Sequence, residues 1–144
     1  MKAALKQREH YSFFLPIQTR WADNDLYGHV NNVTYYSYFD TAANALLIQE
    51  AAFDPKYSPM IGLVVSSQCQ FNRELSYPEI IEVGVAIEKM GNSSLSYDLA
   101  IFKMNSDTAA AQGSFVHVFV DRYTRKSTPI PAEMRDALAR FVSA

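Results

Sequence analysis

The sequence predicts a single α+β domain in which an antiparallel five-stranded sheet wraps around one long helix. Residues 30–52 carry large side chains at helical spacing and contain neither Gly nor Pro. Four later stretches alternate with period two, and the final stretch returns to helical spacing. Successive strands joined by turns form antiparallel sheets, and a lone apolar helix must bury its face against them.

Five strands are expected. The first is residues 13–21, with Pro16 near its start, where a missing hydrogen-bond donor matters least. The other four follow the long helix as runs rich in Val, Ile, Phe or Tyr, and turns at 91–92 and 105–107 separate the later ones. We expect these four strands to form a meander and one sheet edge to pair with another subunit. The strand residues are Val64–Phe71, Ile81–Glu88, Leu95–Ile101 and Gly113–Tyr123.

Two helices are expected, a long one over residues 30–52 and a short one over 131–144. Asn31 and Asn32 suit the N-terminal end of the long helix, because Asn side chains accept the free amides of a first turn. Pro131 suits the start of the short helix. The residues predicted to be buried are Tyr36, Phe39, Ala43 and Leu47 in the long helix and Met134, Leu138 and Phe141 in the short one.

Composition and charge exclude several classes of protein. A formal net charge of -2 argues against a nucleic-acid binder, which needs a basic face. The single cysteine, Cys69, allows no internal disulfide, and the three histidines show no metal-ligand spacing. No stretch approaches the about 20 apolar residues that span a bilayer, and charges interrupt the N-terminus where a signal peptide would be apolar. A cytoplasmic protein without a membrane partner, metal or cofactor is expected.

Candidate chemistry is concentrated at the junction between the first strand and the long helix. Asp23 and Asp25 lie there, Gly28 permits a sharp bend, and the helix begins just after His29. A helix N-terminus presents unpaired amides and a partial positive charge, which would stabilise negative charge developing on a carbonyl oxygen. A nearby carboxylate could attack that carbonyl or activate a water molecule. The residues alone therefore indicate a carboxylate beside an oxyanion site.

The run WADNDLYGHVNNVTY, residues 21–35, resembles the signature of the 4-hydroxybenzoyl-CoA-thioesterase-like branch of the hotdog superfamily. Its HVNN form is similar to the subgroup of long-chain acyl-CoA and plant acyl-carrier thioesterases. The later runs FNRELSYPEIIEVGVAI, GNSSLSYDLAIF and GSFVHVFVDRYTRKSTPIP are similar to the family's strands. The resemblance implies one hotdog thioesterase domain over residues 1–144 that hydrolyses acyl-CoA to free acid and CoA. It also implies a homodimer or homotetramer with the site at the subunit interface.

The resemblance assigns catalytic roles by position. Asp25 matches the family's catalytic aspartate, as base or nucleophile, and the backbone N–H of Asn32 matches its oxyanion donor. His29 matches a histidine of the plant enzymes, but their catalytic asparagine is replaced here by Tyr27. Two readings of His29 therefore stay open, one in which it contacts the thioester carbonyl and one in which it caps the helix.

The remaining site residues also have competing interpretations. Asp25 could instead accept the amides of its own loop in an Asx-turn, and Asp23 is expected to cap the loop or orient its neighbour. Four basic residues could bind the phosphates of CoA or lie solvated at strand ends, namely Arg73, Arg122, Arg125 and Lys126. Gly28 serves either a positive φ or the close approach of substrate. His117 is expected to pack on a strand face. The predicted substrate-binding residues are Tyr27, Gly28, Arg73 and Arg122.

Rival functions come from two other classes. One is a hotdog hydratase or dehydratase acting on acyl thioesters, and the other is a non-catalytic acyl-CoA-binding module. A third variant keeps hydrolysis but replaces CoA with acyl carrier protein. Release of free thiol separates the hydrolase from the first two.

Overall fold

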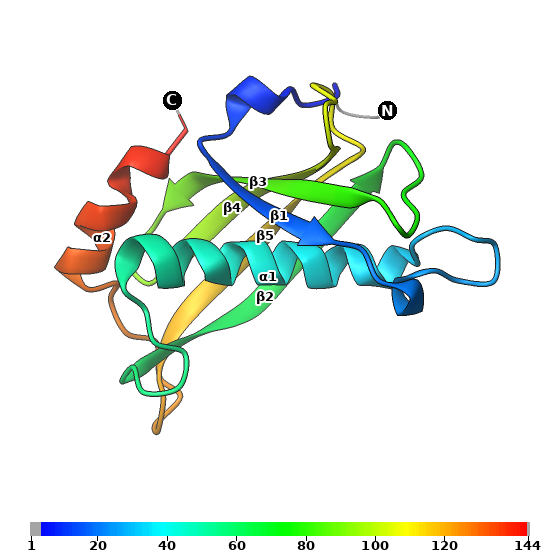
Figure 1. Cartoon of the computed structure of the whole chain (residues 1–144). Helices are drawn as coiled ribbons and strands as arrows, with labels where there is room; N and C mark the ends of the chain where they lie inside the picture. The colour runs from blue at the N-terminus through cyan, green and yellow to red at the C-terminus, as the bar shows by residue number, and fades with distance from the viewer. Residues whose placement is uncertain (1–3, 144) are drawn as a thin grey trace.

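The computed structural model describes residues 4–143 and has the predicted α+β architecture. In Figure 1, one long helix lies across a face of the sheet, with the short helix beside its C-terminal end. No helix of the described part is long and apolar enough to cross a membrane. The elements are η1 (Arg8–His10), β1 (Phe13–Gln18), η2 (Trp21–Asp23), α1 (Asn32–Ala51), β2 (Met60–Phe71), β3 (Ile80–Met90), β4 (Ser94–Lys103), β5 (Ala111–Asp121), α2 (Ala132–Leu138) and η3 (Ala139–Phe141).

The sheet is antiparallel with the strand order β1-β3-β4-β5-β2. Only β3, β4 and β5 form a meander, so the prediction of four consecutively paired strands is wrong for β2. That strand pairs with β5 at the far edge, and residues 72–79 carry the chain across to β3. The first strand ends at Gln18 rather than at residue 21, because the chain turns into η2.

Packing of α1 on the sheet forms the main core. The buried helix residues include the predicted Phe39, Ala43 and Leu47, whereas Tyr36 is only half-buried. The ring of Phe39 meets that of Phe115 edge-on, with centroids 6.0 Å apart. Gly113 permits this approach, because a Cβ there would lie 2.9 Å from Phe39. The predicted burial of the α2 and η3 residues Met134, Leu138 and Phe141 is confirmed.

His117 packs on the same face, as predicted. It is buried on β5, and its Nδ1 lies 3.0 Å from the Tyr97 hydroxyl on β4. Burial lowers the pKa of His117, and the charge of Asp40 opposes that shift. The ring is therefore part of the core.

The β2 edge of the sheet is uncovered. The consecutive residues 63–68 of β2 are all exposed, so side chains on both faces of the strand meet solvent. They include Leu63, Val64 and Val65. A long apolar edge strand of this kind is a surface on which a further strand can pair.

Candidate active site

The loop before α1 forms a short hairpin. Asn24 and Val30 make an antiparallel bridge, and the N–H of Asp25 donates to the His29 carbonyl at 2.8 Å. The N–H of Gly28 donates to the Asp25 carbonyl at 3.1 Å, and Gly28 has a φ of 85°. Of the two predicted reasons for this glycine, the positive φ is confirmed. These hydrogen bonds fix Asp25 at the base of the hairpin.

The side chain of Asp25 is half-buried and makes an Asx-turn. Its Oδ1 accepts the N–H of Tyr27 at 2.8 Å. Within residues 4–143, no protein group donates to the other oxygen, Oδ2. The predicted Asx-turn is therefore confirmed for Oδ1 of Asp25, and Oδ2 is available to contact a substrate or water.

The first turn of α1 leaves an amide unpaired. Asn31 caps the helix, because its Oδ1 accepts the N–H of Val33 at 3.0 Å. Asn32 is the first helical residue, and its N–H meets no acceptor in the described chain, as expected for that position. The prediction of a cap is thus confirmed for Asn31 and wrong for the side chain of Asn32.

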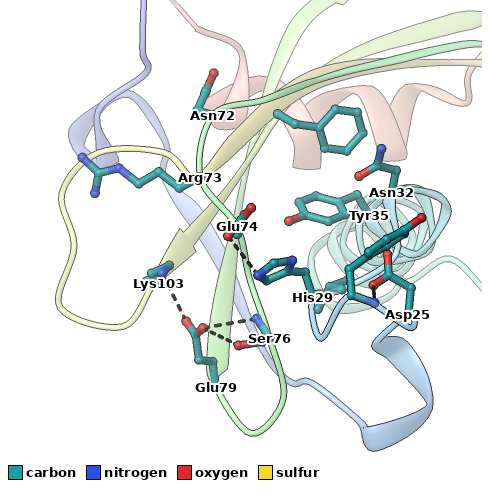
Figure 2. Close-up of a pocket in the computed structure, with 13 residues that line it drawn as sticks. Asp25, His29, Asn32, Tyr35, Asn72, Arg73, Glu74, Ser76, Glu79 and Lys103 are labelled. Carbon is teal, nitrogen blue, oxygen red and sulfur yellow. Dashed lines mark hydrogen bonds and ion pairs between the residues drawn. The ribbon is translucent and has the colours of Figure 1, made fainter.

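Asp25 and Asn32 line one open cleft of about 1060 Å³. It lies between the start of α1 and the connection from β2 to β3 (Figure 2). In that view, Asp25 and Asn32 lie toward one end of the cleft, and Arg73 and Lys103 lie toward the other. The lining residues are Asp25, Tyr27, His29, Val30, Asn32, Tyr35, Phe71, Asn72, Arg73, Glu74, Ser76, Glu79 and Lys103.

His29 points across the cleft to the β2–β3 connection. Its Nε2 lies 2.9 Å from a carboxylate oxygen of Glu74, and Figure 2 shows this contact. Because Asn31 provides the cap, the helix-capping interpretation of His29 is wrong. The ring lines the same cleft as Asp25.

Two cations stand in the cleft. Arg73 is exposed, and Lys103 at the end of β4 has its Nζ 3.8 Å from a Glu79 oxygen. Arg122 does not join them, because its guanidinium donates to the carbonyls of Ser58 at 2.8 Å and Pro55 at 2.7 Å. Arg122 is therefore not a residue of this cleft.

Aromatic rings form the apolar wall. The rings of Tyr35 and Phe71 meet edge-on with centroids 4.9 Å apart. Burial raises the pKa of Tyr35 to about 12, so its hydroxyl stays protonated. Beside them, Nδ2 of Asn72 is the one buried side-chain N or O atom of the described chain without a hydrogen-bond partner.

Three further cleft residues are not among the predicted site residues. Lys103 lies in none of the runs that resemble the family, and Asn72 and Glu74 lie in the run FNRELSYPEIIEVGVAI, which indicates only a strand. The pairing of β2 with β5 and of β3 with β4 brings their segments to the site. In residues 4–143 no group of three His, Cys, Asp or Glu side chains could hold a metal ion.

Comparison with known proteins agrees with this architecture. A family model described as the thioesterase-like superfamily matches residues 19–138. The PA5185 protein of Pseudomonas aeruginosa is 49% identical, with a TM-score of 0.95 over 98% of this chain and 99% of its own. A predicted thioesterase from Bacillus stearothermophilus is 25% identical, with a TM-score of 0.78 over 90% of this chain and 96% of its own.

A curated relative, the uncharacterized protein YsmA of Bacillus subtilis, is 29% identical over 86 residues. That match covers 60% of this chain and 58% of the relative's length. The family model covers most of the described chain, including the hairpin, the cleft and both helices. The chain therefore belongs to the thioesterase-like superfamily of hotdog-fold proteins, whose reaction class is thioester hydrolysis.

Proposed function

We propose that this protein hydrolyses an acyl-CoA thioester to the free acid and CoA. One observation carries the proposal: Asp25, which has a free carboxylate oxygen, and Asn32, which has an unpaired N–H, line the same cleft at the start of α1. A base or nucleophile and an oxyanion donor are the two groups that acyl transfer requires. The family match and the HVNN form of the motif support the same reaction.

The thioester carbonyl oxygen accepts the N–H of Asn32 at the positive end of the helix dipole. In one route Asp25 takes a proton from water while the water oxygen adds to the carbonyl carbon. The tetrahedral oxyanion then collapses, the C–S bond breaks, and the thiolate of CoA leaves and takes a proton. In the other route Oδ2 of Asp25 adds to the carbon, CoA leaves, and water opens the resulting anhydride.

The rest of the cleft suits the carrier part of the substrate. Arg73 and Lys103 are the cations available for the phosphates of CoA. Tyr27, which follows Asp25 closely in the sequence, is exposed and lines the cleft, whereas Gly28 lines a second, smaller hollow together with Tyr27. His29, which Glu74 orients, is placed beside the thioester.

The same proposal includes a homodimer. The exposed β2 edge offers free backbone groups and three consecutive apolar side chains, Leu63, Val64 and Val65. A second copy pairing along this edge would cover both faces of the strand. Size-exclusion chromatography with light scattering measures the mass directly. A monomer at micromolar concentration would contradict the dimer, and a fourfold mass would extend it to a tetramer.

The test of the reaction is thiol release from short, long and aromatic acyl-CoAs by the parent and by Asp25→Asn. Asparagine can still accept the N–H of Tyr27, so the loop should fold, while the base is lost. We expect kcat to fall by about a hundredfold to ten-thousandfold. Asp136→Asn, an exposed position on α2, is the matched control. A folded Asp25→Asn protein with the parent rate on every substrate would refute the proposal, and acyl carrier protein thioesters in the same assay identify the preferred carrier.

A further inference from the structure

A second aspartate, Asp23, lies buried beneath the catalytic loop and accepts four hydrogen bonds. Its Oδ2 accepts the N–H of Arg20 at 2.9 Å and the Tyr38 hydroxyl at 2.7 Å. Its Oδ1 accepts Nε and Nη2 of Arg20 at 3.1 and 2.9 Å. Although burial opposes ionisation, the hydrogen bonds from Arg20 and Tyr38 hold the pKa of Asp23 below its usual range. The carboxylate is therefore charged and fully engaged.

Asp23 connects the loop to α1 at two places. Its backbone carbonyl accepts the N–H of Asn31 at 2.9 Å, next to the proposed oxyanion donor Asn32. Its side chain binds Tyr38, six residues further along the helix, which is about 9 Å along the axis. Asp25 follows two residues after Asp23. These two attachments, together with the backbone hydrogen bonds of the hairpin, set the position of Asp25 relative to α1.

Substrate does not reach Asp23. The residue is 2% exposed and lines none of the clefts around the loop. Any effect of Asp23 on the reaction must therefore pass through the residues that it holds.

We infer that Asp23 and Tyr38 are positioning residues that fix the carboxylate of Asp25 relative to the N–H of Asn32. The inference rests on the proposed function, in which these two groups act on one carbonyl. Asp25 lies on a loop and Asn32 on a rigid helix, and the hydrogen bond between Asp23 and Tyr38 adds a side-chain tie between loop and helix to the backbone hydrogen bonds of the hairpin. A misplacement of about 1 Å can cost about a hundredfold in rate.

Tyr38 is the more informative partner to remove. The Arg20 side chain is 74% exposed, and ion pairs with an exposed partner contribute little. Tyr38 is 4% exposed, so its hydrogen bond forms away from water and has no ready replacement. Loss of its hydroxyl leaves Oδ2 with the Arg20 N–H alone.

The test is Tyr38→Phe, which keeps the ring and removes only the hydroxyl. We expect kcat for an acyl-CoA to fall by about tenfold or more while KM stays within about twofold, because the substrate contacts are intact. Tyr36→Phe is the matched control. It lies on the same helix, is half-buried, and its hydroxyl has no partner within residues 4–143. Thermal unfolding establishes that each variant is folded.

A second variant keeps the test decisive if Tyr38→Phe does not fold. Asp23→Asn retains one oxygen for the Tyr38 hydroxyl and gives up the exposed Arg20 pair. We expect its kcat to stay closer to the parent than that of Asp23→Ala, again with little change in KM. Equal kcat values for the two Asp23 variants would overturn the inference.

Combination with Asp25→Asn separates this inference from the proposed function. If Tyr38 acts by placing Asp25 against Asn32, the hydroxyl should not affect the residual rate once Asp25 has lost its chemistry. A loss in the parent but not in the Asp25→Asn background supports positioning. Equal losses in both backgrounds, or no loss in the parent, overturn it while the proposed function stands. Full activity of Asp25→Asn alone removes the proposed function itself.

Discussion

A charge placed at the cap of α1 should separate stability from catalysis. Asn31 accepts the N–H of Val33 at 3.0 Å and is exposed. Aspartate at this position can accept the same hydrogen bond and adds a negative charge at the positive end of the helix. We expect Asn31→Asp to raise the free energy of unfolding by about 0.3–1 kcal/mol.

The same charge should slow the reaction. It would stand next to the N–H of Asn32, where the proposed oxyanion forms. Two negative charges about 6 Å apart repel by about 0.7 kcal/mol in water and about 2.8 kcal/mol at an effective dielectric constant of about 20. Since each 1.36 kcal/mol corresponds to about tenfold in rate, kcat should fall by between about threefold and a hundredfold.

Urea unfolding and thiol release at saturating acyl-CoA measure the two effects separately. At about 1 M salt the Debye length falls to about 3 Å, so the loss in kcat should shrink. Asn31→Ser keeps a capping oxygen without the charge and serves as control. If folded Asn31→Asp retains the parent kcat at low ionic strength, the N–H of Asn32 does not bind the oxyanion.

Three further predictions concern the binding of the CoA phosphates, the role of Asp25 in the reaction and the protonation of the buried His117. Arg73→Ala and Lys103→Ala should each raise KM for acyl-CoA. Hydrolysis of an N-acetylcysteamine thioester should stay unchanged, because that carrier has no phosphates. Equal effects on both substrates would contradict phosphate binding. If Asp25 is the nucleophile and water opens the anhydride at the aspartyl carbon, single turnover in ¹⁸O-water should label Asp25. Label in the Asp25 peptide, measured by mass spectrometry, would therefore exclude the role of base alone. Burial lowers the pKa of His117 in the folded protein, whereas in the unfolded chain the same side chain binds a proton below about pH 6.5. The free energy of unfolding should therefore fall as the pH decreases, and His117 should contribute at most about 1.4 kcal/mol per pH unit to that fall. In His117→Gln the free energy of unfolding should depend less steeply on pH. If the variant and the parent show the same pH dependence, His117 does not cause it.

The helices and the loop before α1 could be predicted from the sequence because their signals are local. The buried stripe of α1 follows from side-chain spacing, and the cap at Asn31 follows from residue type next to that stripe. Asp25 stands out because of its motif. Its Asx-turn was foreseeable as well, since aspartate commonly accepts the amide two residues ahead.

The position of β2 could not be predicted in the same way. Its residues alternate as those of β3 do, yet Val83 and Val85 are buried in the sheet interior whereas Val65 is exposed at the edge. Periodicity gives the faces of a strand but not its neighbours. Lys103 reaches the cleft only because of that pairing order, and Arg122 is absent from it because β5 ends at the opposite side.

The hairpin before α1 has a base whose residues must stay constant and a tip whose residues can vary. Its base is fixed by backbone hydrogen bonds and by Asp23, whereas Leu26 and Tyr27 at the tip are exposed and leave the core untouched. Substitutions at such exposed positions usually change stability by no more than about 0.5 kcal/mol. The tip can therefore change by sequence drift without endangering the fold, while Asp25 at the base of the hairpin keeps its place.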